Sequence, residues 1–534
     1  MLKRLLNKVT RSAGNEKLLK AFFANPPKTD GSSGSVLHYV GIGSMYLTPV
    51  EVLFYHLLRK HQFNVDYLIY DESIPINEVI TKEREERTGK DKFWNSSCRD
   101  AVNFLDAANV EHETIEVSSR AREIVDKLPD LDSVLQFQFE EIDFGDIVTG
   151  AMYRYYKSLT FGDSAESVAR RLLITSLSNY LCVQARCSKK DYRFIAFSHG
   201  IYVTWQPVVA FCKREGIDFI CYDRGKKKGH CNFNVNQPSP DWSFDSAWKR
   251  YADRKLTPEE QSQVRQYLND RELQQGDVYS YNFSERASNV EQEKQRLKIP
   301  LDRKCITIFT NLIWDAANVS RDIAFPSALQ CVIETIERYR DRDDVQVLVR
   351  SHPAEKVIGT KERYTGLVQS HFGDQLPANV TLISPEDDVN SFTMIDISDV
   401  GVVNTSTVGL EIAMLGKPII LISETHYRGK GFTIDAENPE HYFEELERGL
   451  AEPTLPESQQ KLAEKYFYIM MFLYQQQLPV QYEGTEFQKY AVDHFDRLAS
   501  DDPLVRIVRS LVDGMPEDFI VWPESGAQLT ATNS

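Results

Sequence analysis

Two turns in the second half of the chain carry side chains suited to binding an anion. In the first, the β-rich run Val345–Arg350 is followed by Ser351, His352 and Pro353. A guanidinium, a hydroxyl and an imidazole therefore follow one strand, in a turn that Pro353 restricts because its ring fixes φ. This group suits a phosphate or a carboxylate. The alternative stays open that Arg350 is a surface cation and His352 an ordinary loop histidine.

In the second turn, the run Val400–Asn404 leads into Ser406 and Thr407 and then into a helical pattern that contains Gly409 and Glu411. A helix start offers unpaired backbone N–H groups and the positive end of its dipole to a phosphate. The hydroxyls add donors, Gly409 permits close approach, and Glu411 could accept from ribose hydroxyls, as the acidic residue of dinucleotide sites does. The alternative is that Ser406 only caps the helix and Glu411 favours its dipole. Because both turns suit the same ligand, we predict a nucleotide site there.

The first half offers candidates for proton transfer. His199 follows the run Phe194–Ser198, where an imidazole could act as a general base. Asp315 follows the first strand of the second half and adds a carboxylate. A structural loop histidine and a helix N-cap are the respective alternatives. The basic run Arg224–His230 suits an acidic glycan or a lipid diphosphate acceptor, or is a solvated loop.

These turns need strands to position them, and the pattern of the chain provides such strands. Short β-rich runs alternate with longer helical patterns in both halves, which predicts parallel strands with helical crossovers. We therefore expect two Rossmann-like units, whose ligands lie outside the carboxyl ends of the strands. The predicted strands are Val36–Val40, Val65–Tyr70, Thr114–Val117, Phe194–Ser198 and Asp218–Tyr222, then Cys305–Thr310, Val345–Arg350, Val380–Ile383, Val400–Asn404 and Pro418–Leu421.

Composition shifts predict the boundaries of these units. A polar, charged stretch separates the two alternating sets, and within it Thr257, Pro258 and Glu260 form a helix start with a capping box. The predicted parts are a basic N-terminal helix with its tether (1–34), an acceptor unit (35–235), a helical linker (236–300), a nucleotide-sugar donor unit (301–455) and C-terminal helices that pack back on the first unit (456–534).

The composition disfavours several classes of protein. The 534 residues include 62 basic and 78 acidic side chains, and the net charge of −16 disfavours a general nucleic-acid binder. Eight scattered cysteines without a C-x-x-C pair predict reduced thiols and a cytoplasmic location. No apolar run approaches the roughly 20 residues of a membrane-spanning helix. The aromatic run Tyr466–Tyr474 is predicted to be a helix buried between the units.

The first 23 residues form a basic amphipathic pattern, in which six lysines and arginines outnumber the single acid Glu16. Two interpretations stay open. The helix lies on an anionic membrane surface, which would place the protein peripherally at the inner face of the plasma membrane, or it packs on the body of the protein.

Three segments of the second half resemble the bacterial capsule polysaccharide biosynthesis protein family. They are Arg350–Pro353 (RSHP), Ile397–Ile422 (ISDVGVVNTSTVGLEIAMLGKPIILI) and His426–Thr433 (HYRGKGFT). The match is strongest from Val345 to Thr433 and looser in the first half. The family comprises glycosyltransferases of the GT-B type, some of which use CMP-activated 3-deoxy-manno-octulosonic acid (Kdo).

The resemblance implies a GT-B-like α/β fold, with two Rossmann-like domains facing a cleft. It also implies a glycosyltransferase that moves a sugar from a nucleotide sugar to a surface polysaccharide or its lipid-linked primer. No cofactor or metal is implied, because GT-B enzymes generally stabilise the leaving phosphate with a helix dipole and cations. The implied nucleotide-sugar-binding residues are His352 and Pro353 at the phosphate or base edge, Ser406 and Thr407 at the phosphate, Glu411 at the ribose, and Arg428 and Lys430 beside the leaving nucleotide.

Three alternatives stay open. A CDP-glycerol-type polyol-phosphate transferase also carries a His-Pro pair and a Ser/Thr-rich turn, but forms a phosphodiester. A catalytically silent GT-B scaffold of a polysaccharide synthase complex would show no turnover. An epimerase of the same architecture would convert the donor without an acceptor. The sequence contains neither a P-loop motif nor a G-x-S-x-G motif.

Overall fold

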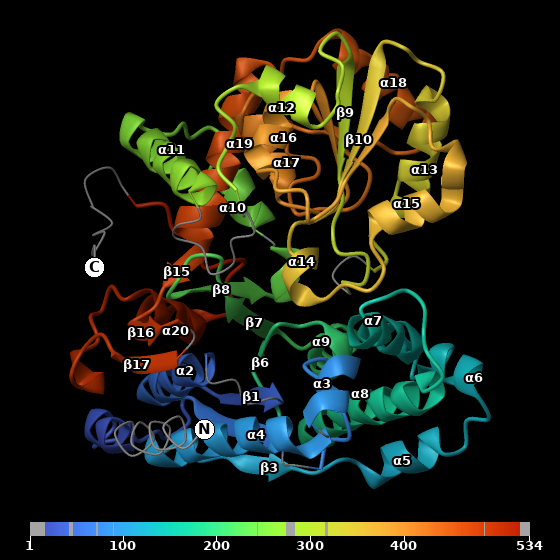
Figure 1. Cartoon of the computed structure of the whole chain (residues 1–534). Helices are drawn as coiled ribbons and strands as arrows, with labels where there is room; N and C mark the ends of the chain where they lie inside the picture. The colour runs from blue at the N-terminus through green and yellow to red at the C-terminus, as the bar shows by residue number, and fades with distance from the viewer. Residues whose placement is uncertain are drawn as a thin grey trace, which may run out of the picture.

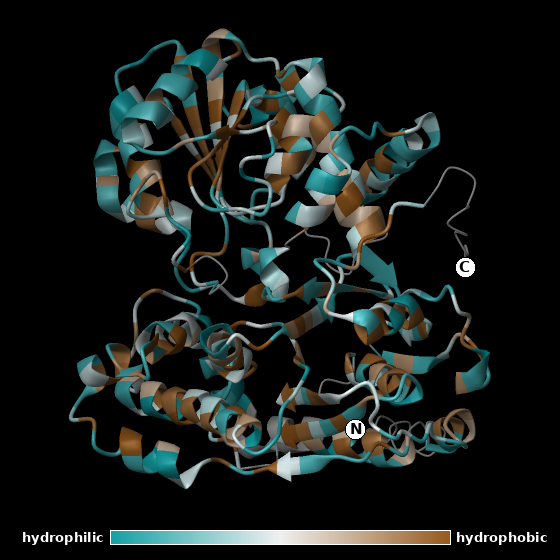
Figure 2. Cartoon of the chain, turned by 180° about the vertical axis from the view of Figure 1, so that it is seen from behind, coloured by the Kyte–Doolittle hydropathy of each residue, from teal (hydrophilic) through white to brown (hydrophobic). Residues whose placement is uncertain are grey.

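The computed structural model describes residues 16–41, 46–70, 73–88, 90–242, 244–273, 284–315, 319–484 and 486–523. In these residues the chain forms two α/β units, one above the other in Figure 1, each built on a mainly parallel sheet with helices on both faces. Seen from behind, the strands of the upper sheet are apolar, whereas the surrounding helices are largely polar on their outer sides (Figure 2). The predicted α/β fold with two Rossmann-like units is confirmed.

The first sheet has the strand order β15-β8-β7-β6-β1-β2-β3. Its strands β1, β2, β3, β6 and β7 run parallel, and β8 and β15 add an antiparallel edge. The strands are β1 Ser35–Gly41, β2 Asn64–Tyr70, β3 Glu113–Ile115, β6 Phe194–Ser198, β7 Phe219–Arg224, β8 His230–Val235 and β15 Gln475–Gln477, and the helices are α2 Thr48–Lys60, α3 Lys82–Thr88, α4 Lys90–Ala107, α5 Ser119–Val125, α6 Leu131–Leu135, α7 Phe144–Tyr156, α8 Ala165–Cys187 and α9 Tyr202–Glu215.

The second sheet has the order β11-β10-β9-β12-β13-β14, and all of its strands are parallel. In chain order this is 3-2-1-4-5-6, the order of dinucleotide-binding sheets. The strands are β9 Lys304–Phe309, β10 Val345–Arg350, β11 Val380–Ile383, β12 Val400–Val403, β13 Ile419–Leu421 and β14 Ile434–Asp435, and the helices are α13 Ala328–Tyr339, α14 Glu355–Ile358, α15 Tyr364–Phe372, α16 Ser391–Ile397, α17 Val408–Met414 and α18 Pro439–Ala451.

All ten strands predicted from the sequence are present, with ends that differ from the prediction by at most two residues. The structure adds β8, β14 and β15, together with the hairpins β4 Gln138–Phe139 with β5 Ile142–Asp143 and β16 Val480–Glu483 with β17 Glu486–Tyr490. These additions are short strands or, in the case of β8 (HCNFNV) between β15 and β7, a polar strand, so they lack the apolar runs that identify a central strand.

A helical segment links the two sheets, with α10 Asp245–Arg250, α11 Pro258–Glu272 and α12 Val290–Arg296. The capping box predicted at the start of α11 is confirmed. Glu260 N donates to Thr257 Oγ1 at 3.2 Å, and Thr257 N donates to Glu260 Oε2 at 2.8 Å.

The chain then crosses back to the first unit. Helix α19, Glu457–Tyr468, continues as a π-helix over Ile469–Tyr474 and leads directly into β15, which pairs with β8. The predicted burial of Tyr466–Tyr474 is confirmed, since Tyr466 is 1% exposed and Tyr474 2%. The hairpin β16–β17 and α20, Pro503–Asp513, pack on the first unit, so the return contains strands as well as the predicted helices.

Residues 16–22 of the predicted N-terminal helix are helical and lie on the body of the protein. Leu19, Phe22 and Phe23 are buried, and the ring of Phe23 stacks on His56 at 4.3 Å. This end of the segment fits the packing interpretation, whereas residues 1–15, which hold most of its cations, lie outside the described residues. Among the described helices, none has the length and apolarity needed to cross a bilayer.

A buried polar cluster lies between α2 and the first sheet. Glu51 is 1% exposed and accepts hydrogen bonds from Tyr222 Oη at 3.0 Å and Tyr67 Oη at 3.4 Å. Because Tyr222 donates its proton to Glu51, it accepts from His38 Nε2, which lies at 2.8 Å. Burial raises the pKa of Glu51 to about 8 and lowers that of His38 to about 3, so both side chains are neutral near pH 6.

Glu51→Gln should remove a pH-dependent loss of stability. The folded chain holds the Glu51 proton to about pH 8, whereas an unfolded chain releases it near the ordinary value of 4.5, so wild-type stability falls as pH rises between these values. The slope is at most about 1.4 kcal/mol per pH unit. Glutamine does not titrate, so the melting temperature of the variant relative to wild type should rise from about pH 5 to about pH 8. Parallel melting curves against pH would contradict this.

Candidate functional site

The strand order of each sheet marks where a ligand would bind. In the second sheet the crossovers leave β9 and β12 in opposite directions, which opens a crevice beyond their carboxyl ends. The turns that follow these strands, residues 310–315 and 404–407, are joined by Asn311, whose Nδ2 donates to Thr405 Oγ1 at 2.8 Å. In the first sheet β1 and β6 mark the equivalent point, and His199 directly follows β6.

His199 lies in a strained turn and is paired with a carboxylate. Its φ is 62°, that of Gly200 is 88° and that of Tyr202 is 65°. Non-glycine residues rarely adopt positive φ, and such strain concentrates at functional sites. His199 Nδ1 lies 2.7 Å from Oδ2 of Asp223, which lies in β7. This pair can hold the imidazole in one orientation and leave Nε2 for a reacting proton.

Tyr202 connects His199 to the second unit. Its ring stacks on the imidazole with centroids 5.6 Å apart, and its hydroxyl donates to Asp315 Oδ1 at 3.1 Å. Arg154 Nη1 in turn donates to the Tyr202 hydroxyl at 3.3 Å. The two predicted catalytic candidates, His199 and Asp315, are therefore brought together across the units. The sequence did not identify Tyr202 or Arg154, which lie in helical patterns that carry no chemical motif.

His352 lies in the turn after β10, with a defined tautomer. Its Nδ1 accepts from Ala354 N at 3.2 Å, so in the neutral ring the proton is on Nε2. Burial and the positive charge of Arg350 lower the pKa of His352 to about 4, and the negative charge of Asp315 opposes this change. The charge of Lys226 also acts on His352 and lowers its pKa. At neutral pH the imidazole in this turn is therefore uncharged, with its proton on Nε2.

A lysine of the first unit reaches the hydroxyl-rich turn of the second. Lys226 Nζ donates to Thr407 Oγ1 at 2.9 Å and lies 5.5 Å from the centroid of the Trp242 ring. Lys226 belongs to the basic run that the sequence associated with an acceptor or a solvated loop. Its neighbours Arg224 and Lys227 lie over the rings of Tyr46 and Phe472. The sequence contained the cation but no signal for its partner, because the contact joins residues 181 positions apart.

Other predicted donor-site residues have partners within the protein. Arg350 is 3% exposed and donates from Nη1 to Ser384 O at 3.0 Å and from Nη2 to Val389 O at 2.9 Å, and burial lowers its pKa to about 10. The Glu411 side chain is 4% exposed and lies 2.5 Å from Arg271 Nη1 in the linker helix α11. In this conformation Arg350 holds the loop that contains Ser384 and Val389. Glu411 connects helix α17 to the linker helix α11.

Packing accounts for the glycine in the second turn. A Cβ on Gly409 would clash with the hydroxyl of Tyr427, which donates to Ser406 O at 2.5 Å. At the start of α17, Ser406 Oγ accepts a long hydrogen bond from Val408 N at 3.4 Å. In the other turn, after β10, Pro353 O accepts from Lys356 N at 3.3 Å. Gly409 thus lets Tyr427 hold the shape of the turn.

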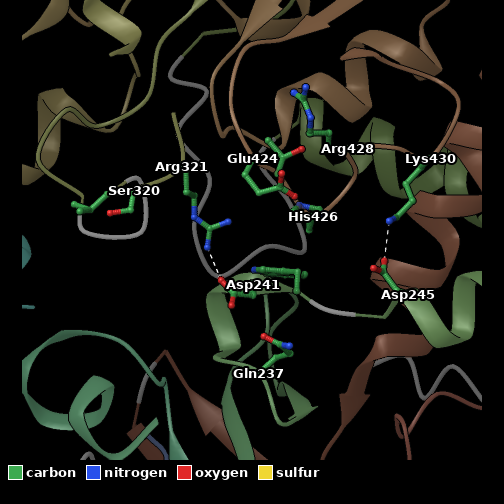
Figure 3. Close-up of a pocket in the computed structure, with 12 residues that line it drawn as sticks. Gln237, Asp241, Asp245, Ser320, Arg321, Glu424, His426, Arg428 and Lys430 are labelled. Atoms are coloured by element: carbon green, nitrogen blue, oxygen red, sulfur yellow. Dashed lines mark hydrogen bonds and ion pairs between the residues drawn. The ribbon is translucent and has the colours of Figure 1, made fainter. Parts of the chain in front are cut away.

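Arg428 and Lys430 line a cavity of about 450 Å³, here termed the inter-unit cavity, whose lining residues do not include Ser406 or Thr407 (Figure 3). Lys430 Nζ lies 2.7 Å from Asp245 Oδ1, and Arg428 Nη2 donates to Ala436 O at 2.8 Å. The cavity is lined by Gln237, Asp241, Trp242, Asp245, Val319, Ser320, Arg321, Glu424, Thr425, His426, Arg428 and Lys430.

The described residues contain no group of three or more His, Cys, Asp or Glu side chains arranged to hold a metal ion. The eight cysteines are free thiols, and six of them are buried.

A further inter-unit contact, here termed the latch, involves Glu362. Its Oε2 accepts from Ser158 Oγ and from Leu159 N, both at 2.7 Å, and its Oε1 accepts from Thr160 Oγ1 at 3.1 Å. The first-unit residues follow α7, and Glu362 follows α14, on the other side of Figure 1 from α19 and β15. The latch thus adds to the inter-unit contacts of Tyr202 and Lys226, at a distance from the crossing through α19 and β15.

A comparison with models of protein families identifies a family that part of this chain resembles. Residues 246–474 match the family model described as capsule polysaccharide biosynthesis protein. The matched stretch contains the segments in which the sequence resembles that family, so the resemblance is confirmed there. A search of curated proteins gives no match.

Solved structures give remote matches. The KpsC beta Kdo 2,4 transferase of Thermosulfurimonas dismutans is 14% identical, with 54% of this chain and 82% of that chain covered and a TM-score of 0.34. The UDP-GlcNAc 2-epimerase of Neisseria meningitidis is 10% identical, with 82% and 99% covered and a TM-score of 0.24. A putative UDP-N-acetylglucosamine 2-epimerase of Listeria monocytogenes is 12% identical, with 91% and 99% covered and a TM-score of 0.30.

Glu362→Ala should favour an open arrangement of the units. Interfaces between domains of one chain generally permit relative motion. Removing a charge-assisted contact worth about 1.5 kcal/mol would change the ratio of open to closed molecules roughly tenfold. Small-angle scattering should then show a larger radius of gyration, with faster proteolysis of the connecting segment. Glu437→Ala, on an exposed side chain of the second unit, is the control. Identical scattering from both variants would show that the latch does not hold the units.

Proposed function

We propose that this chain, whose residues 246–474 match capsule polysaccharide biosynthesis proteins, is a glycosyltransferase that moves a sugar from a nucleotide-sugar donor to a surface polysaccharide or its lipid-linked primer. In this proposal the second unit holds the nucleotide at the turns after β10 and β12, and the first unit supplies the proton-transfer group. The resemblance to enzymes with CMP-linked donors makes CMP the first nucleotide to test.

The contact between Lys226 and Thr407 carries the proposal. A nucleotide leaving group develops negative charge on phosphate, and preorganised cations and N–H donors stabilise such charge most effectively. The chain as a whole carries −16, so a phosphate needs local positive charge. Lys226 supplies it at 2.9 Å from the Thr407 hydroxyl, and His352 adds an uncharged N–H donor from the neighbouring turn. The phosphate site is thus completed only when the first unit meets the second.

His199 is the proposed general base. Asp223 orients its ring, so Nε2 can accept the proton of an acceptor hydroxyl while that oxygen bonds to the anomeric carbon of the donor sugar. The bond from that carbon to the phosphate oxygen breaks, and the nucleotide leaves with the electron pair. Tyr202 and Asp315 fix the distance between this base and the second unit. Holding both substrates in this geometry supplies much of the acceleration.

Lys226→Met should weaken nucleotide binding by about tenfold or more, since a charged hydrogen bond is worth roughly 1.5–3 kcal/mol. Calorimetry and thermal shift with CMP, CDP, UDP, GDP and their sugar conjugates measure the effect. The control is Lys228→Met, in the same basic run but with an exposed side chain. Equal losses in both variants would indicate a general field effect. Preference for CDP would favour a polyol-phosphate transferase, and absence of any nucleotide binding by wild type would contradict the proposal.

His199→Gln should lower kcat by about 10²–10⁴-fold, the usual contribution of a general base, with nucleotide affinity unchanged. Asp223→Asn should give a smaller fall in kcat, because it removes the partner that orients the ring. Turnover is measured by nucleotide release in the presence of acceptor. Wild-type kcat in His199→Gln would exclude His199 as the base.

A further inference from the structure

The turn that carries His199 leads into helix α9, which begins without a side-chain cap. Its N-cap residue, Ile201, forms no side-chain capping bond. The positive φ values of His199 and Tyr202 add strain at the same place. Strained backbone persists only where the surrounding structure holds it. The orientation of the imidazole therefore depends on contacts that other elements make with the start of α9.

Four consecutive residues at the start of α9 form hydrogen bonds with other elements. The first is Tyr202, which bonds to Arg154 and Asp315. The bonds of the next three run from Asn179 Nδ2 to Val203 O at 2.7 Å, from Thr204 Oγ1 to Glu78 Oε2 at 2.9 Å and from Trp205 Nε1 to Val40 O at 3.3 Å. The start of the helix is thus held from several sides.

Glu78 reaches this turn by two routes. Its carboxylate accepts the hydrogen bond from Thr204, which is fully buried. Its backbone carbonyl accepts from Arg154 Nε at 2.8 Å, and Arg154 Nη1 donates to the Tyr202 hydroxyl. One residue therefore holds Thr204 directly and Tyr202 through Arg154.

The turn that contains Glu78, between β2 and α3, is itself fixed by hydrogen bonds. Asn77 Oδ1 accepts from Val79 N at 2.9 Å, and Thr175 Oγ1 of α8 donates to Ile76 O at 2.6 Å. A side chain on such a support can hold its partner in a defined position, as a functional site requires.

The Glu78 carboxyl is buried near the imidazole. The residue is 4% exposed, and its Oε1 has no hydrogen-bond partner among the described residues. Burial raises the pKa of Glu78, whereas hydrogen bonds from its own backbone N–H and from Thr204, and the positive charges of His199 and Arg154, lower it. Because the charge of the His199 ring acts on this carboxyl, the two side chains lie within each other's electrostatic field.

We infer that Glu78 is a positioning residue for His199. Through Thr204 and Arg154 it holds the strained turn in the conformation that pairs the imidazole with Asp223 and stacks it on Tyr202. The inference rests on the proposed function, in which His199 is the general base. Glu78 itself contacts no substrate in this scheme and acts through the turn.

The test compares two changes of Glu78 with one change of its partner. Glu78→Ala removes the acceptor for Thr204, whereas the amide oxygen of Glu78→Gln still accepts. Thr204→Val removes the hydroxyl and keeps the shape of the side chain. The controls are Glu86→Ala, on an exposed side chain of α3, and Thr335→Val, which loses a buried threonine hydroxyl in the second unit. Nucleotide release gives kcat and KM. NMR of ¹³C-labelled histidine reports the His199 ring, whose signals are assigned by their loss in His199→Gln.

Glu78→Ala and Thr204→Val should lower kcat about 10–100-fold, because a small displacement of a catalytic group has an effect of this size. KM and nucleotide affinity should stay within about twofold of wild type, and the double variant should lose no more than the larger single loss, since both changes break one contact. Glu78→Gln should keep kcat within about threefold of wild type. A loss in Glu78→Gln as large as in Glu78→Ala, or an unchanged kcat in Thr204→Val, would overturn the inference. If melting curves show that Glu78→Ala does not fold, Thr204→Val decides the outcome.

Failure of the proposed function gives a different result. If wild type transfers no sugar, the glycosyltransferase proposal fails, and the NMR comparison alone decides the role of Glu78. The His199 ring signals should then shift in Glu78→Ala and Thr204→Val and match wild type in both controls. His199 signals that match wild type in Thr204→Val would overturn the inference in that case.

Discussion

The geometry of the site depends on one continuous segment, residues 457–477, that belongs to both units. Its first part, α19, packs in the core of the second unit, and its last part is strand β15 of the first sheet. Tyr466 bonds to His426 in the second unit, and eight residues later the Tyr474 hydroxyl accepts from Asn232 and donates to Asn234 in the first. Because this segment is buried, the units cannot turn freely about it. The carboxyl ends of the two sheets therefore face each other.

The same constraint explains why the site contains pairs of residues distant in sequence. Lys226 with Thr407 and Tyr202 with Asp315 each join one unit to the other. The latch at Glu362 closes the opposite side of the interface. The site is thus a property of the closed arrangement, and closure of this kind also excludes water from the reacting groups.

The positions of the candidate residues were predictable because a parallel sheet gathers its ligands at strand ends. The ten strands could be located from their apolar runs, and His199, Asp315, His352 and Thr407 follow them closely. The hydrogen-bond partners of these residues could not be predicted, because the periodicity of a sequence indicates which face of a helix or strand a residue occupies. It does not indicate which residue of another element lies against that face. Arg350 illustrates this: it ends a strand as expected, yet its guanidinium turns to the carbonyls of Ser384 and Val389.

The inter-unit cavity and the Lys226–Thr407 contact differ in how their charges are paired. Around the inter-unit cavity each cation is matched by a carboxylate or by carbonyls, which lowers the free energy of burying charge but leaves little net field. At Thr407 the ammonium of Lys226 meets a neutral hydroxyl, beside the neutral imidazole of His352. The first place thus holds paired charges, whereas at the second a cation donates to an uncharged hydroxyl.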